Sequence, residues 1–333
     1  MKKKLFILTV IITATAVFGA AASCNLCGVN VETSPTAPDT VQQSPAEEVG
    51  VEFAGGAGES NQSETGDSVE NEAVNEQEIN AGNGMPAMAE IVPIFAIASE
   101  AGDRLITYYF NTVEETLKNI NSATHKDGHA YNIEYAGKQQ KNDNDSGRVI
   151  SENFDNMEGY VYRVTGNDLL TANKSYFLYN SHAIEETGIL SPVNNGVEEL
   201  DEETLQRAED IKGRQIQKGW LISEYNDGTK LSVIVFQPDG QDMLMSIVLD
   251  FGGNLILNDY PATMKGYSAW RVDDGGEINP ELFSSIVAIK TSEGLCAAVG
   301  WAGAEGEKIL FLAEDAGSLI ELPLDIYRYW LTS

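Results

Sequence analysis

Residues 219–260 read GWLISEYNDGTKLSVIVFQPDGQDMLMSIVLDFGGNLILNDY, and this stretch gives the strongest indication of the fold class. It contains four short runs rich in β-branched and aliphatic residues. Between them stand the turn-forming segments 226–228 (Asn-Asp-Gly), 238–240 (Pro-Asp-Gly) and 252–253 (Gly-Gly). Strand-length apolar runs separated by such turns are typical of consecutive β-hairpins. The stretch therefore predicts an antiparallel meander, and both faces of the run at 230–236 are apolar, which predicts a central strand.

A second set of runs with the same spacing follows toward the C-terminus. It comprises SSIVAIK (284–290), LCAAVGW (295–301), KILFLAE (308–314) and SLIEL (318–322). Two aromatic runs, GYVYRV (159–164) and SYFLYN (175–180), precede the meander and also predict strands. The runs within residues 219–260 and those within residues 284–322 cannot be aligned residue by residue, so they do not indicate an internal repeat.

Two segments predict helices. In residues 102–122 the apolar side chains recur at helical spacing, and Asp103 is an expected N-cap. In residues 202–212 an apolar stripe lies between a capping Asp201 and a terminating Gly213. Because helices and strands are segregated, we expect an α+β fold, with two or so helices packed on antiparallel sheets. We expect one folded domain over residues 88–333, with a possible subdivision near residue 213.

The N-terminus has the three parts of a secretory signal. Lys2, Lys3 and Lys4 form a positive segment, residues 5–18 are uncharged and apolar, and small residues occupy positions 19–23. The apolar run is short for a permanent membrane span, which needs about 20 residues. We therefore expect residues 1–23 to be a cleaved signal peptide.

The segment Ala21-Ala22-Ser23-Cys24 resembles the lipobox of bacterial lipoproteins, although its first position holds Ala where that family prefers Leu. The resemblance implies cleavage before Cys24 and lipidation of its sulfur, with a diacylglycerol anchor at the extracytoplasmic side of the cell membrane. Two acyl chains hold a protein stably at a membrane, whereas one binds only marginally. Free secretion from a cut before Ser23, or an uncleaved signal anchor, are the alternatives. The role of Cys27 is open.

Residues 24–87 predict a disordered acidic tether. The segment is rich in Glu, Asn, Gly, Ser, Thr and Pro, and neither Lys, Arg nor His occurs between Lys4 and Arg104. Such a chain buries too little apolar surface to offset its conformational entropy, and its like charges repel each other. We therefore expect a spacer that holds the folded domain away from the membrane.

The net charge of −30 excludes some partners. Binding to nucleic acid depends on Lys and Arg that neutralise phosphates, so we expect no nucleic-acid partner. With only three cysteines, no disulfide framework is expected, and Cys296 in an apolar run is expected to be a buried hydrophobe. We expect no cofactor, although the acidic composition leaves a divalent cation possible.

His125, Asp127 and His129 form the strongest candidate metal site. Two imidazoles and a carboxylate are zinc-ligating groups, and His182 could add a third nitrogen. The same residues could also be ordinary histidines of a polar loop. A helical arrangement is not expected because Gly128 interrupts the segment.

A second candidate site is an aromatic platform for a sugar or a peptide. Its residues are Tyr160, Tyr162, Tyr176 and Tyr179, on the two predicted strands. Tyrosines at strand alternation also form core and cross-strand pairs, so the platform and the core remain alternative interpretations.

The sequence contains no P-loop, nucleophile elbow, zincin motif or paired C-x-x-C metal motif, and no catalytic residue is assigned. The leading hypothesis is an envelope-tethered lipoprotein that acts as a binding or interaction module for an unknown envelope or extracellular ligand. An extracytoplasmic hydrolase of glycan or peptide, with an Asp/Glu pair, is the first alternative. A structural or accessory protein of an envelope assembly is the second.

Overall fold

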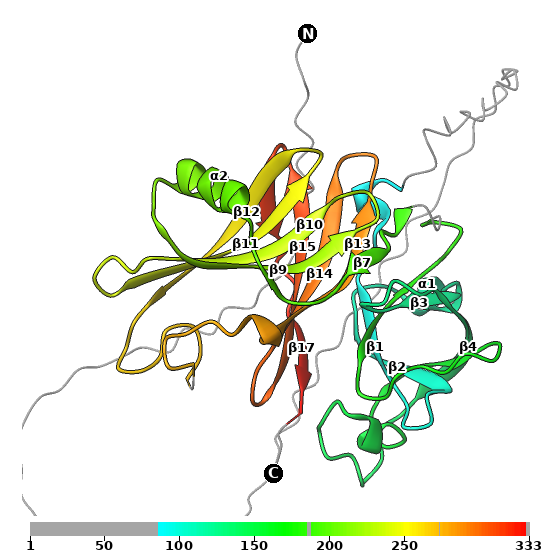
Figure 1. Ribbon diagram of the computed structural model, residues 1–333. Helices are drawn as coiled ribbons and strands as arrows, with labels where there is room; N and C mark the ends of the chain where they lie inside the picture. Colours follow the sequence, from blue (N-terminus) through cyan, green and yellow to red (C-terminus); the bar gives the residue numbers. More distant parts are fainter. Residues whose placement is uncertain (1–85, 185–187, 273, 331–333) are drawn as a thin grey trace, which may run out of the picture. The chain divides into compact units, whose positions relative to one another are not determined.

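Antiparallel β-structure dominates the computed structural model, which describes residues 86–184, 188–272 and 274–330 (Figure 1). The antiparallel sheets expected from the sequence are thus confirmed. Helix is a minor component of the described residues: α1 (Glu114–Lys118) is a single turn, α2 (Glu202–Lys212) has 11 residues, and three short 3-10 helices span Met88–Glu90, Ser151–Asn153 and Pro280–Leu282.

The first part of the described chain forms a closed six-stranded barrel. Around the barrel the strand order is β1 (Ile94–Ala98), β2 (Arg104–Phe110), β5 (Gly159–Val164), β4 (Tyr131–Gln139), β3 (Ser122–Thr124) and β6 (Ser175–Tyr179). β6 pairs with β1 and closes the ring. Apolar and aromatic side chains fill the interior, as expected for a small barrel.

The remaining strands form two sheets. The first, called here the β7–β12 sheet, contains β7 (Pro192–Asn194), β8 (Glu198–Glu199), β9 (Ile216–Tyr225), β10 (Lys230–Phe236), β11 (Asp242–Phe251) and β12 (Asn254–Thr263). The second, called the β13–β17 sheet, contains β13 (Phe283–Lys290), β14 (Leu295–Ala302), β15 (Gly306–Asp315), β16 (Ser318–Glu321) and β17 (Ile326–Tyr329).

The two sheets pack face to face and share an apolar core. Val233, Ile247 and Leu231 from the first sheet meet Val299 and Leu310 from the second. As predicted, β10 is a central strand with β9 and β11 on its two sides, and its residues from Leu231 to Phe236 are all buried. The predicted meander and the four following strands are confirmed.

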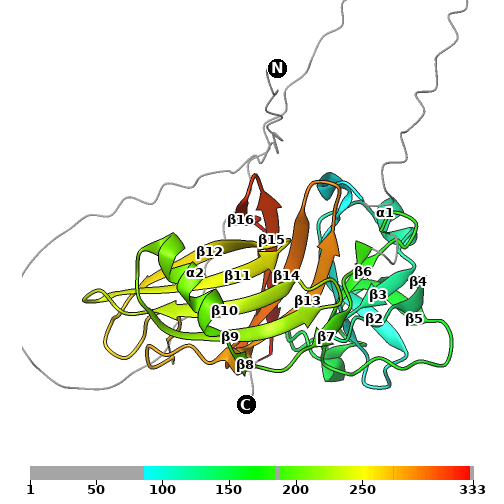
Figure 2. The same ribbon diagram turned by 45° about the horizontal axis from the view of Figure 1, so that its top comes forward.

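Helix α2 covers the outer face of the β7–β12 sheet (Figure 2). Asp201 caps its first turn, because its carboxylate accepts a hydrogen bond of 2.7 Å from the Thr204 backbone N–H. Gly213 ends the helix with a positive φ of 62°. Both ends and the helix itself agree with the sequence prediction.

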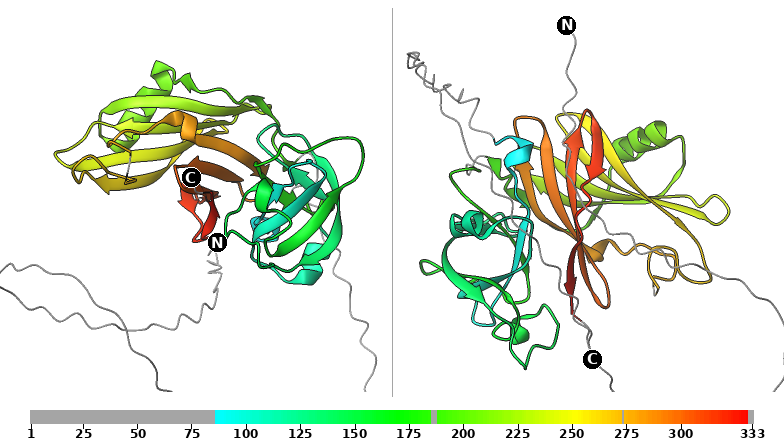
Figure 3. Two further views of the ribbon diagram at one scale, coloured as in Figure 1. Left: turned by 90° about the horizontal axis from the view of Figure 1, so that it is seen from below. Right: turned by 180° about the vertical axis from the view of Figure 1, so that it is seen from behind.

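The outer face of the β13–β17 sheet packs against the barrel. Phe311 and Ile309 of β15 join Phe95 and Phe177 of the barrel in one buried cluster, and the Phe95 and Phe311 rings meet edge to face with centroids 6.5 Å apart. The β13–β17 sheet therefore lies between the β7–β12 sheet and the barrel, as the views in Figure 3 show.

The predicted helix over residues 102–122 is wrong. Residues 104–110 form strand β2, followed by the single turn α1, and Ser122 begins β3. Leu105 lies in the barrel interior, whereas its neighbour Ile106 packs outside against Phe154. A strand buried on both faces has consecutive apolar residues, and here they matched helical spacing. Asp103 does not cap a helix; its carboxylate accepts a hydrogen bond of 2.8 Å from Ser99.

All described residues belong to one compact unit. β7 and β8, which precede residue 213, pair with β9, which follows it. Within the described ranges, none of the helices combines the length and the apolar composition that a membrane crossing requires. Cys24 and residues 24–85 of the expected tether lie outside the described residues.

Candidate functional site

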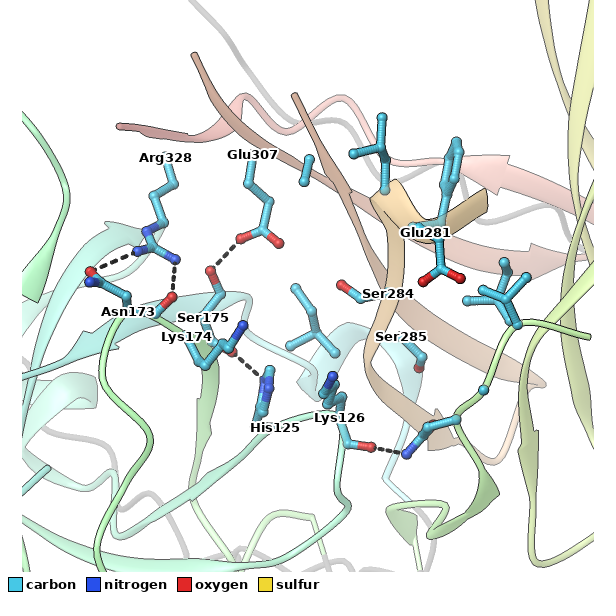
Figure 4. Close-up of a pocket in the computed structure, with 18 of the residues that line it drawn as sticks. His125, Lys126, Asn173, Lys174, Ser175, Glu281, Ser284, Ser285, Glu307 and Arg328 are labelled. Atoms are coloured by element: carbon cyan, nitrogen blue, oxygen red, sulfur yellow. Dashed lines mark hydrogen bonds between the residues drawn. The ribbon is translucent and has the colours of Figure 1, made fainter. Parts of the chain in front are cut away.

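A polar pocket of about 540 Å³ lies between the barrel and the β13–β17 sheet (Figure 4). The barrel contributes the end of β3 and the start of β6, while the sheet contributes β13, β15 and β17. A loop around residues 195–197, the 3-10 helix Pro280–Leu282 and Ile222 of β9 add to the lining. This volume lies within the usual range for small-molecule sites.

Glu307 is the buried carboxylate of the pocket. It lies on β15 with only 9% of its surface exposed, and its Oε2 accepts a hydrogen bond of 2.5 Å from Ser175 Oγ of the barrel. Among the described residues, its Oε1 has no hydrogen-bond partner. A buried carboxylate without full pairing is costly, so this oxygen is a natural acceptor for a ligand.

Gly300 creates the space that the Glu307 carboxylate occupies. A Cβ atom at Gly300 would lie 2.6 Å from Glu307 Oε1 and 2.9 Å from the Ser284 hydroxyl oxygen. Ser284 stands directly opposite Gly300 in the pairing of β13 with β14. The missing side chain therefore lets a carboxylate and a hydroxyl group come together on one wall.

Arg328 lies opposite Glu307 in the β15–β17 register and is 3% exposed. Its guanidinium does not bond to that carboxylate. It donates to the main-chain oxygens of Val149 and Asn173, at 2.8 and 2.9 Å, and to Asn173 Oδ1. These bonds attach β17 to barrel loops, and the positive charge partly offsets that of Glu307.

Three side chains form a hydrogen-bonded chain from the barrel to the sheet. The Tyr108 hydroxyl donates to Ser175 Oγ at 3.1 Å, and Ser175 Oγ in turn donates to Glu307. Burial, and after it the charge of Glu307, raises the pKa of Tyr108 above its ordinary range. The tyrosine is therefore a fixed neutral donor, which holds Ser175 and Glu307 in place.

His125 lies in the pocket wall and is also 9% exposed. Its Nδ1 is 2.9 Å from the main-chain oxygen of Ser175, so Nδ1 carries the proton and Nε2 is an acceptor. Burial lowers the pKa of His125 to about 4, against the opposing effect of the hydrogen bond to Ser175. The ring is neutral at pH 7, and among the described residues Nε2 has no partner.

A very small cavity, of about 10 Å³, adjoins His125 on the side of Tyr225 and Ser285. The hydroxyl groups of these two residues share a short hydrogen bond. A space of this size is at the lower limit for one water molecule.

The two sides of the pocket differ in charge, because the barrel side carries two lysines and the other side carries two glutamates together with the buried Arg328. Lys126 and Lys174 come from the barrel, and Figure 4 shows their side chains on that wall. Glu307 comes from β15 of the sheet, and Glu281 comes from the 3-10 helix Pro280–Leu282 that precedes β13. Among the described residues neither lysine forms an ion pair, although both lower the pKa of His125 by their charge.

The residues of the predicted metal site do not converge on one point. His125 is buried against Ser175, whereas His129 is exposed with its Nε2 3.3 Å from Asp168. Asp127 instead accepts hydrogen bonds from the His129 backbone N–H and from the Tyr131 hydroxyl. Within the described part of the chain, no group of three or more His, Cys, Asp or Glu residues is placed to hold a metal ion.

The four tyrosines of the predicted platform are buried. Tyr160, Tyr162 and Tyr176 pack inside the barrel, and Tyr179 lies in the cluster between the barrel and the β13–β17 sheet. None is more than 8% exposed. A stacking platform needs open ring faces, so these tyrosines are core residues and do not form the predicted platform.

The predicted lipidation site, Cys24, lies outside the described residues, as does Cys27. Cys296 is fully buried in the cluster between barrel and sheet. Burial, followed by the charge of Glu293, raises the pKa of its thiol to about 12, so it is no thiolate nucleophile.

Apart from His125, the pocket residues were missed by the sequence analysis. One signal was present: Glu307 and Arg328 stand at inward positions of strands in which the alternate residues, such as Ile309 and Ile326, are buried and apolar. Charged residues at core positions indicate a functional site more often than charged residues elsewhere. The lysines and serines carry no comparable signal.

Comparisons with protein-family models, with curated proteins and with solved structures found no match to this chain.

Proposed function

We propose that this chain is an extracytoplasmic binding module, held at the cell membrane through a lipidated Cys24, and that it binds a small polar ligand between the barrel and the β13–β17 sheet. The observation that carries the binding role is the partly paired Glu307 carboxylate in the pocket wall. Buried charge is retained at a cost in stability, and recognition of a ligand accounts for that cost.

The construction of the pocket supports binding. Its polar groups are held by the surrounding structure: Ser175 by Tyr108, the His125 ring by a main-chain oxygen, and Arg328 by three acceptors. A preorganised set of this kind loses little entropy when a ligand enters.

A ligand panel tests the binding role. Amino acids, dipeptides, monosaccharides, sugar acids and nucleosides are added to the purified chain, and the unfolding temperature is measured. Gly196→Trp is the blocking variant, because Gly196 lines the pocket in an exposed loop with ordinary φ and space for a Cβ. Leu169→Trp, at an exposed position outside the lining, is the matched control.

We expect at least one panel class to raise the unfolding temperature of the wild type and of Leu169→Trp but not of Gly196→Trp. A panel that affects all three proteins equally, or none, contradicts the binding role.

The anchor is supported by the N-terminal sequence alone, through the lipobox-like Ala21-Ala22-Ser23-Cys24. Its test is incorporation of an alkyne-labelled fatty acid in a bacterial host, followed by membrane fractionation. Cys24→Ala should lose label and membrane association, while Cys27→Ala should keep both. If Cys27→Ala loses the label while Cys24→Ala keeps it, the lipid is attached to Cys27 and the prediction for Cys24 is wrong.

One observation favours a hydrolase as the second candidate function. Glu281 and Glu307 both line the pocket, and a pair of carboxylates is the equipment of a glycosidase. The test is turnover of chromogenic glycosides and peptides by the wild type, Glu281→Gln and Glu307→Gln. Hydrolysis that either substitution abolishes favours the enzyme, whereas binding without turnover favours the module.

A further inference from the structure

The division of charge between the two walls restricts the class of ligand. In a chain with a net charge of −30, Lys126 and Lys174 gather at one side of a pocket whose other side carries Glu281, Glu307 and Arg328. The Arg328 guanidinium already donates hydrogen bonds to Val149 and Asn173. A purely anionic ligand would meet the two carboxylates, and a purely cationic one would meet the lysines and Arg328. Either arrangement would leave like charges facing each other.

The acceptors of the site lie close to one residue. Ser175 donates its hydroxyl proton to Glu307 and offers its main-chain oxygen to His125, so the carboxylate and the imidazole flank the same position in β6. Glu307 Oε1 is an acceptor without a partner among the described residues, whereas His125 Nε2 is a fully buried atom of the barrel wall. A ligand group rich in N–H donors suits the Glu307 side of the pocket.

The lysines provide the complementary end. Their ammonium groups have three donors each and no acceptor, and both side chains are exposed at the pocket. A carboxylate on the ligand can receive charge-assisted hydrogen bonds from them. The donor-rich end of the ligand would then point to the sheet and its anionic end to the barrel.

We infer that the pocket binds a zwitterion with a free ammonium and a free carboxylate, namely an amino acid or a short peptide, with the ammonium at Glu307 and Glu281 and the carboxylate at Lys126 and Lys174. This inference rests on the proposed binding function and names its ligand class. The pocket volume of about 540 Å³ accepts a dipeptide as well as a single amino acid.

Isothermal titration with three matched probes tests the inference. The probes are L-alanyl-L-alanine, its C-terminal amide and its N-acetyl derivative, which differ in one charge each. We expect the uncapped dipeptide to bind the wild type at least tenfold more tightly than either capped form, because each cap leaves one wall without its counter-charge.

Substitutions assign each charge to its wall. The Lys126→Gln/Lys174→Gln double variant should lose the preference for the free peptide over the amide, while Glu307→Gln should lose the preference over the N-acetyl form. If Glu307→Gln does not fold, Glu281→Gln tests the same wall from an exposed position. Lys141→Gln, an exposed lysine outside the lining, is the control and should behave as wild type.

The outcomes separate this inference from the proposed function. Equal affinity for the three probes, or tightest binding of a capped form, overturns the zwitterion while the pocket remains a binding site. The zwitterion is also overturned if the dipeptide does not bind but another class of the panel does, and if Gly196→Trp abolishes that binding. If no compound distinguishes the wild type from Gly196→Trp, the binding function itself fails.

Discussion

The two faces of the β13–β17 sheet differ in what they bury. Toward the β7–β12 sheet, β15 presents Leu310 and Leu312 to a large apolar core. Toward the barrel, the same strand presents Ile309 and Phe311 to an apolar cluster, but Glu307 to a polar pocket. Two stacked sheets interdigitate the side chains of their inner faces, whereas a curved barrel touches a facing sheet over part of its surface.

The pocket exists because the interface between the barrel and the β13–β17 sheet is incomplete. Where the barrel meets the sheet, aromatic rings hold the two together, and where the barrel curves away, polar side chains line the space. The barrel interface should therefore be the one linked to the site. Three experiments test this difference between the two interfaces.

The largest effect is expected at Phe311 and Leu310, which are consecutive residues on opposite faces of β15. Each is at most 2% exposed. Phe311→Ala should lower the free energy of unfolding by about 3–5 kcal/mol, and Leu310→Ala by about 2–5 kcal/mol. Denaturant unfolding measures both values.

Hydrogen exchange distinguishes the two variants by location. Phe311→Ala should increase exchange mainly in β1 and β6, which supply Phe95 and Phe177 to the shared cluster. Leu310→Ala should affect both sheets instead. If both variants increase hydrogen exchange in the same strands, the two interfaces are not separate and the comparison is wrong.

The second effect concerns His125 at the polar edge of the barrel interface. Burial lowers the pKa of His125 in the folded protein to about 4, from 6.5. Between these values the unfolded chain binds more protons than the folded one, so the free energy of unfolding decreases as the pH falls. The full difference corresponds to about 3 kcal/mol, present above pH 6.5 and lost by about pH 4.

His125→Gln should flatten this part of the stability curve, as measured by urea unfolding at several pH values. Lys126, Lys174 and Asp127 also act on the ring, so the ionic strength is held constant. His129→Gln is the control, because it removes an exposed histidine and keeps the buried His125, so the slope caused by His125 should persist. An unaltered slope in His125→Gln would show that the imidazole is not held neutral by the fold.

The smallest effect is expected far from the barrel, at the cap of α2. Asp201→Ala removes the hydrogen bond to the Thr204 backbone N–H, and the expected loss of stability is about 1 kcal/mol. Ligand binding should not change, because α2 covers the outer face of the β7–β12 sheet. A change in the affinity of the pocket would mean that the two sides of the molecule are coupled.

The local patterns of the sequence were sufficient for the two-sheet region. Hairpin turns such as Asn226-Asp227-Gly228 connect neighbouring strands that pair directly, so local signals and tertiary contacts agree there. The same holds for α2, whose cap and terminator stand at its two ends. In the barrel, by contrast, β2 looked helical because Leu105 and Ile106 are buried on opposite faces.

The candidate site was hardly predictable. The histidine turn attracted attention through its spacing, but only His125 lines the pocket, and it does so through contacts with β6. The tyrosines at 160, 162, 176 and 179 were assigned to the right strands, yet nothing local indicates that those strands close into a ring with the side chains packed within cores.

Turns, strand lengths, one helix with both its caps, and the acidic character of the chain were determined by the sequence itself, because each depends on residues that are neighbours along the chain. The closed barrel and the pocket were decided only by the tertiary structure. Ser175 and Glu307, 132 positions apart, meet across two sheets, and Arg328 stands beside them from the last strand. Such a meeting depends on the free energy of closing and packing whole sheets, which no short window of sequence contains.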